Sequence, residues 1–175
     1  VKIRDTLADL TEEDIFQYGI DGCSAPNFMC SIKGLALSMA KLATLRKLSR
    51  SQITSTRLIL NSMSKFPHLI AGQGKACTEL MIASDNQLVV KGGAEGVYVA
   101  ACVDRGLGIA LKIADGSKRA SEAAIATILV RLGILEYKHP AVLKRVFSPL
   151  KNWKGLDIGC IRPTKTFWED GRKLI

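Results

Sequence analysis

The segment that most constrains the fold is the glycine-rich stretch K-G-G-A-E-G at residues 91–96. It stands between two apolar runs, residues 88–90 and 97–101, which predict two strands joined by a short connection. Its glycines, with only a small alanine between them, leave backbone that a ligand or another segment can approach closely. Lys91 and Glu95 are its charged side chains, and a plain hairpin in which both are solvated is the alternative interpretation.

The residues around this stretch predict an antiparallel meander covered by helices. A third apolar run at 107–113 follows the first two strands, and a long helix is expected from Lys118 to Leu132. Ser117 or Asp115 would cap that helix and Gly133 would end it. Further predicted elements are two short helices within 3–16, helices at 32–45, 51–65 (stopped by Pro67) and 76–83, a loop at 18–28 and a last strand at 156–161. The predicted fold class is therefore α+β, in a single domain spanning residues 1–175.

Composition excludes several classes of protein. The chain has 175 residues, of which 47% are hydrophobic and 23% charged, as expected of a soluble globular domain. No apolar run is long enough to cross a bilayer. The net charge of +9 is spread along the chain rather than gathered in one run, which disfavours a nucleic-acid-binding module. The five cysteines include no C-x-x-C pair, which indicates reduced thiols and a cytoplasmic protein.

Two patterns carry candidate chemistry besides the glycine-rich stretch. The loop G-I-D-G-C-S-A-P at 19–26 places Asp21 beside Cys23, a pairing that suits a metal ligand or a reactive thiol. One cysteine and one aspartate cannot complete a four-coordinate site, so further ligands would lie elsewhere. The pattern S-x-x-K, which serves penicillin-interacting serine enzymes, occurs three times, but two copies lie in ordinary amphipathic helices and the third contains a proline. We reject all three as nucleophiles.

Several motifs in register resemble the rhizobial-type L-asparaginases, also called the asparaginase II family. The loop at 19–26 resembles the family's G-[IV]-D-G-C-x-x-P signature, and residues 91–96 look like its K-G-G-A-E-G. The likeness runs in the family's order from Gly19 to Pro163. It also includes P-x-L-I-A-G-x-G at 67–74, the block at 106–120, and N-W-K-G at 152–155.

The resemblance implies a fold and a reaction. The fold would be similar to the C-terminal part of serine β-lactamases and penicillin-binding proteins, with Lys91 on the strand at the edge of the active site. The reaction would be hydrolysis of the side-chain amide of L-asparagine to aspartate and ammonia, through a serine nucleophile activated by lysine. Lys91 is carried over as a catalytic base or orienting cation, and Asp21 as a site residue. Cys23 matches the family's zinc ligand, and substrate would approach Gly92, Gly93 and Glu95.

The chain also departs from the family pattern. The family's nucleophilic S-x-x-K and its C-S-G-K-H segment, which holds the remaining zinc ligands, precede the D-G-C loop, and neither occurs in this sequence. The chain therefore looks like the C-terminal half of an asparaginase. A truncated product, one of two associating halves, and a reduced homologue that lost catalysis are the three explanations left open.

These departures lead to two hypotheses about function and one about assembly. The first is an amidohydrolase whose nucleophile comes from a missing N-terminal half or a second chain. The second is a catalytically inactive binding or scaffold homologue of the same fold. Because half of such a fold would leave a sheet edge unpaired, we expect another polypeptide or a second copy to cover that edge, as in a homodimer.

Overall fold

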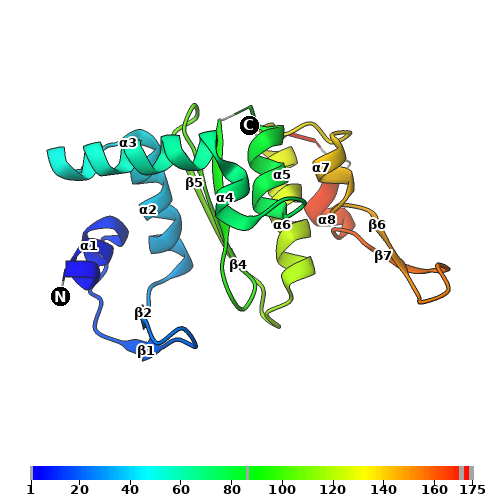
Figure 1. The fold of residues 1–175 in the computed structure, drawn as a ribbon, viewed down its shortest axis with the longest axis horizontal. Coiled ribbons are helices and arrows are strands. Elements are labelled where there is room, and N and C mark those ends of the chain that lie inside the picture. The colour runs from blue at the N-terminus through cyan, green and yellow to red at the C-terminus, as the bar shows by residue number, and fades with distance from the viewer. Residues whose placement is uncertain (1, 86, 170–171, 174–175) are drawn as a thin grey trace.

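A central three-stranded sheet organises the computed structural model, which describes residues 2–85, 87–169 and 172–173 (Figure 1). The elements are, in chain order, α1 (Lys2–Thr11), β1 (Tyr18–Ile20), β2 (Pro26–Phe28), α2 (Ile32–Thr44), α3 (Arg50–Lys65), α4 (Pro67–Ala71), α5 (Ala76–Ala83), β3 (Leu88–Gly92), β4 (Val97–Cys102), β5 (Leu107–Lys112), α6 (Lys118–Arg131), α7 (Pro140–Leu143), β6 (Ser148–Lys151), β7 (Asp157–Ile161) and α8 (Lys165–Trp168).

The sheet is the antiparallel meander that the sequence predicted. Its strand order is β3-β4-β5, and Val90 pairs with Ala100, which in turn pairs with Ile109 on the third strand. The fold class of antiparallel strands with helices packed on them is therefore confirmed at this level.

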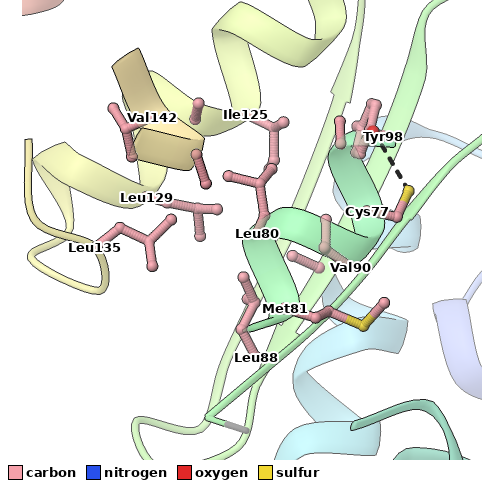
Figure 2. Packing of buried hydrophobic residues seen from close by; sticks show 14 of the residues in the cluster. Cys77, Leu80, Met81, Leu88, Val90, Tyr98, Ile125, Leu129, Leu135 and Val142 are labelled. Carbon is pink, nitrogen blue, oxygen red and sulfur yellow. Dashed lines mark hydrogen bonds between the residues drawn. The ribbon is translucent and has the colours of Figure 1, made fainter. Parts of the chain in front are cut away.

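Helices cover both faces of this sheet, with α2 on one side and α5 and α6 on the other (Figure 1). On the α5–α6 side, Leu80 and Ile125 pack against Val90 in a buried apolar cluster (Figure 2). All three side chains are fully excluded from solvent. At about 25 cal/mol per Å² of apolar surface, burial of this kind is the main stabilising contribution to the fold.

On the opposite face of the sheet, the backbone of α2 packs directly against the backbone of β5. A Cβ atom at Gly108 would lie 2.1 Å from the carbonyl oxygen of Ala36 and 2.2 Å from the amide nitrogen of Ala40. Near the start of β5, a Cβ at Gly106 would lie 2.8 Å from Cγ2 of Thr44, at the end of α2. The helix therefore runs antiparallel to β5, and its N-terminal end lies toward the end of that strand.

Side-chain caps fix where the main helices begin. Ser117 accepts a hydrogen bond from the amide of Ala120 and starts α6, while Ser31 accepts one from Gly34 and starts α2. The prediction of Ser117 as a cap is confirmed. Helix α3 ends at Lys65, as predicted before Pro67, but Pro67 then opens α4, because proline is well suited to the first turn of a helix.

The peripheral segments depart most from the sequence predictions. Residues 18–28, predicted as a loop, form the β1–β2 hairpin, in which Tyr18 pairs with Phe28. The predicted last strand exists as β7, but it pairs with β6, a strand that contains Pro149 and was not predicted. A two-stranded ribbon tolerates proline because each strand has a free edge that needs no donor. Residues 3–16, predicted as two short helices, contain the single helix α1, which ends at Thr11.

Candidate functional site

The K-G-G-A-E-G stretch forms the end of β3 and the turn into β4. Two hydrogen bonds close the turn. The amide of Gly93 donates to the carbonyl of Val97 (2.8 Å), and the amide of Val97 donates to the carbonyl of Ala94 (3.2 Å). Gly96 has a φ of 71°, in the left-handed region that glycine adopts without strain. The sequence therefore places glycine where the turn requires it.

Lys91 is exposed at the last residues of β3. Its Nζ donates to the carbonyl of the neighbouring Gly92 at 2.6 Å, so the amine is held beside the backbone of the glycine pair. The carboxylate of Glu95 takes another direction, because a Cβ at Gly116 would lie only 2.8 Å from its Oε2. Glu95 thus lies against the loop that precedes α6.

A thiol and a phenol lie behind the glycine pair. The amide of Gly92 donates to Sγ of Cys77 at 3.2 Å, and the same sulfur is 3.3 Å from the hydroxyl of Tyr98 (Figure 2). Burial, and then the contact with Cys77, raise the pKa of Tyr98, which keeps the phenol protonated. A Cβ at Gly92 would meet the Tyr98 ring at 2.9 Å, so this position also requires glycine.

Lys91, Gly92 and Gly93 line a hollow of about 280 Å³. Cys77 and Tyr98 form part of its wall, and Lys118 and Glu122 from α6 also line it. Three of the predicted site residues are therefore brought together at one concave surface, and Cys77 and Tyr98 join them. No motif in the sequence singles out Cys77 or Tyr98 as a site residue.

Glu95 does not line the hollow, and the last two predicted site residues, Asp21 and Cys23, lie in the β1–β2 hairpin. Sγ of Cys23 donates to Oδ2 of Asp21 at 3.4 Å, and both residues are exposed. The amide of Ser24 donates to the Asp21 carbonyl at 2.8 Å and closes the loop between the strands. Neither Asp21 nor Cys23 belongs to the lining of the 280 Å³ hollow.

The topology nevertheless brings this hairpin to the end of the sheet that carries Lys91. The hairpin leads into the N-terminal end of α2, which lies toward the end of β5. The amide of Ile113, just after β5, donates to the carbonyl of Gly96 at 3.1 Å, so the end of β5 adjoins the glycine-rich turn. In Figure 1 the hairpin and this turn both lie on the lower side of the molecule.

A comparison of the sequence with protein-family models assigns the chain to a family. The family model described as L-asparaginase II matches residues 1–163, which include both the hairpin loop and the glycine-rich turn. This chain belongs to the L-asparaginase II family. Membership places it among the asparaginase-like amidohydrolases. The search of curated proteins returned no match.

One S-x-x-K copy in this L-asparaginase II family member is buried and occupied by structural contacts. On α2, the hydroxyl of Ser38 donates to the carbonyl of Leu35 at 2.7 Å. The amine of Lys41 donates to the carbonyl of Asp9 at 2.5 Å and forms an ion pair with Glu12 at 3.1 Å. Both Ser38 and Lys41 are at most 5% exposed. Ser38 therefore bonds within α2 and Lys41 ties α2 to α1, and neither faces substrate.

The described part of this family member contains no cluster of three or more His, Cys, Asp or Glu side chains able to hold a metal ion. Cys23 and Asp21 supply one thiol and one carboxylate, and a four-coordinate zinc site takes more ligands than these two provide. The two side chains thus fit part of such a site.

Within residues 2–85, 87–169 and 172–173, no helix is long and apolar enough to span a membrane.

Beside the hollow, Glu79 joins two elements through an ion-pair network that sequence patterns did not reveal. Its carboxylate accepts from Lys144 at 2.7 Å and from Arg145 at 2.6 Å. Burial acts to raise the pKa of Glu79, but the hydrogen bonds from Lys144 and Arg145 outweigh it and hold the pKa below its ordinary value. The network ties α5 to the segment after α7.

Proposed function

We propose that the chain supplies the lysine-bearing part of an active site that hydrolyses the side-chain amide of L-asparagine to aspartate and ammonia. The observation that carries this proposal is the position of Lys91, which lines a hollow together with Gly92 and Gly93 and whose amine bonds the Gly92 carbonyl. Membership of the L-asparaginase II family supports the reaction class.

Lys91 would act on a nucleophile that comes from other polypeptide. Amides resist direct attack by water because resonance stabilises them, so a covalent acyl-enzyme divides the barrier into two lower ones. A serine hydroxyl would attack the amide carbon while a neutral amine accepts its proton, and ammonia would leave as the acyl-enzyme forms. In this scheme, Lys91 is either that base or the cation that orients a second serine.

The hairpin loop would contribute the remaining polar groups. Cys23 would provide a thiolate ligand for zinc, which can supply Lewis-acid or structural support, with the other ligands coming from the polypeptide that bears the nucleophile. Asp21 lies 3.4 Å from that sulfur and would fix the orientation of the loop. The open backbone of Gly92 and Gly93 would let substrate approach β3, with Glu95 at the turn.

The polypeptide that completes the site would also complete the sheet. Within the described residues, β5 pairs with β4 alone, so its outer edge is unpaired. Unpaired edges favour the addition of another strand. We propose that an N-terminal half of the same domain, or a second chain in a homo-oligomer, adds to this edge and extends the fold toward that of serine β-lactamases.

The alternative function is a noncatalytic binding homologue of the same fold. The observation in its favour is that the S-x-x-K pair Ser38–Lys41 is buried and occupied by structural contacts. Such a protein would bind asparagine or aspartate without turning it over.

Ammonia release distinguishes the two functions. The chain is assayed with L-asparagine alone and after mixing with an N-terminal family segment that carries S-x-x-K and C-S-G-K-H, and thermal unfolding is followed in parallel. Ammonia release in the mixture supports the enzyme. Stabilisation by asparagine without ammonia in either condition supports the binding protein and refutes the proposed activity.

A further inference from the structure

A second, larger cleft adjoins the Lys91 hollow and is lined mainly by cations. It has a volume of about 580 Å³ and shares Lys75, Ala76, Lys118 and Glu122 with the smaller hollow. Its five cationic side chains are Lys75, Lys118, Arg119, Lys144 and Arg145. The nearby carboxylates are those of Glu122, of Glu79, which pairs with Lys144 and Arg145, and of Asp115, which accepts from the amide of Ser117. Five cations against three carboxylates leave a local excess of two positive charges.

Three of these cations are not neutralised by the protein. Lys75, Lys118 and Arg119 are exposed at the mouth of the cleft and form no ion pair with any residue that the structure describes. Like charges that gather around one concavity repel one another, and this repulsion is relieved when an anion binds among them.

The ends of two helices add to the positive potential. Helix α6 begins at the cleft, after Ser117, and α5 begins at Ala76 without any side-chain cap on its first amides. The N-terminal end of a helix carries a partial positive charge and unpaired amide groups, both of which favour bound anions. The two helix ends therefore both raise the positive potential in the cleft.

Arg145 supplies an independent sign of an absent ligand. Its side chain is 4% exposed, and it lines the cleft while its NH1 and NH2 groups bond Ala141 and Glu79. Its Nε has no hydrogen-bond partner, and the nearest carboxylate oxygen, on Glu122, is 3.9 Å away. A buried charged donor left unpaired is costly, so a small rearrangement of the cleft wall that let a ligand oxygen reach Nε would be stabilised.

We propose that this cleft binds a small multivalent oxyanion, namely a phosphate group, either free or as a phosphate monoester. L-asparagine is a zwitterion whose ammonium group would be repelled by the excess positive charge, whereas a phosphate dianion matches it. Lys118 and Arg119 contact the anion from the mouth and Arg145 from the wall. The shared residues Lys75 and Lys118 then link occupancy of this cleft to the field at Lys91.

The test is calorimetric titration of the chain with inorganic phosphate, in a non-phosphate buffer with chloride at matched ionic strength. Saturable binding is expected. Lys118→Ala should weaken it about tenfold, the effect of losing one hydrogen bond to a charged group. The matched control is Lys154→Ala, which removes another exposed cation outside the cleft and should leave the affinity within about twofold of the parent.

Arg145→Lys tests the wall of the cleft, because it keeps the charge but removes Nε, and its affinity should also fall about tenfold. If circular dichroism shows that this variant does not fold, the Lys118 comparison decides alone.

Titration with O-phospho-L-serine separates the two sources of phosphate. Tighter binding than that of inorganic phosphate indicates a monoester, and equal binding indicates the free ion.

Three results would overturn the proposal: no saturable binding, equal loss of affinity in Lys118→Ala and Lys154→Ala, or tighter binding of L-asparagine than of phosphate at this cleft. The measurement requires no turnover. Its outcome is therefore separate from that of the asparagine assay.

Discussion

The central layers and the β1–β2 hairpin contribute to the candidate site in opposite ways. The sheet and its helices place Lys91 and the glycine pair by dense packing, with Leu80, Val90 and Ile125 fully buried behind them. The hairpin carries Asp21 and Cys23 on an exposed loop, and Ile20 beside them is 68% exposed. The position of Lys91 is therefore fixed by the core, whereas the positions of Asp21 and Cys23 are fixed only by local hydrogen bonds.

This difference indicates which part of the site is preformed. A side chain on a packed strand keeps its position because moving it would open the core. An exposed two-stranded hairpin is marginally stable by itself and is ordered by what it contacts. We therefore expect the Lys91 side to be ready for substrate, and the Cys23 side to need zinc or further polypeptide.

The largest expected effect comes from a cavity in the core. Leu80→Ala should lower the free energy of unfolding by about 3–4 kcal/mol, since it removes buried contacts between α5 and the sheet. Ile20→Ala in the hairpin should change it by less than about 0.5 kcal/mol. Urea unfolding followed by circular dichroism measures both, and similar losses for the two would contradict the distinction between core and hairpin.

Glu79→Gln should cost about 3 kcal/mol, because it leaves the buried guanidinium of Arg145 without its closest counter-charge. The folded-state pKa of Glu79 is lowered, so its contribution is fully present above the ordinary value of 4.5 and is lost as the pH falls below it. The stability difference between parent and variant should shrink below about pH 4.5. A difference that stays constant down to pH 3 would argue against the ion pair.

Gly108→Ala tests the backbone contact between β5 and α2. The added Cβ would lie 2.1 Å from the Ala36 carbonyl oxygen, so the helix must shift, at a cost of about 2–3 kcal/mol. Gly22→Ala in the hairpin loop is the matched control, because nothing lies within 4 Å of its Cβ position. Thermal melts should separate the two variants, and equal melting temperatures would contradict the close packing of α2.

Cys23→Ala should have the smallest effect on stability, within about 0.5 kcal/mol, because the side chain is exposed and bonds only Asp21. Zinc binding by the complete assembly should in contrast be lost, since thiolate is the strongest ligand the loop offers. Metal content after dialysis measures this. Retention of stoichiometric zinc by the variant would remove Cys23 from the proposed site.

Much of the centre could be predicted from sequence because its signals are local. Apolar runs bounded by glycines defined β3, β4 and β5, and Ser117 and Gly133 bracketed α6. The family resemblance added Lys91 and the glycine pair, and its assignment to an asparaginase family is confirmed. These inferences succeed where one short stretch determines its own conformation.

The missed features depend on residues far apart in the chain. Cys77 contacts Gly92 and Tyr98 across 15 and 21 positions, and Glu79 meets Arg145 across 66. No periodic pattern records such pairings. The β1–β2 hairpin was missed because Asp21 and Gly22 in its turn, and Pro26 at the start of β2, indicate loops and hairpins alike. The zinc site and the catalytic roles of Lys91 and Asp21 stay predictions.

The most direct test of the central claim compares two exposed lysines with the same local hydrogen bond, of which Lys91 alone lines the hollow. Lys91 is the penultimate residue of β3 and Lys112 is the last residue of β5. Both are exposed and donate to the carbonyl of the following residue at 2.6 Å. In the mixture with the N-terminal family segment, Lys91→Met should lower kcat for ammonia release by at least about a hundredfold, the range expected of a general base. Lys112→Met should leave kcat within about twofold of the parent. Equal kcat values for the two variants would contradict the assignment of Lys91 as the reacting amine.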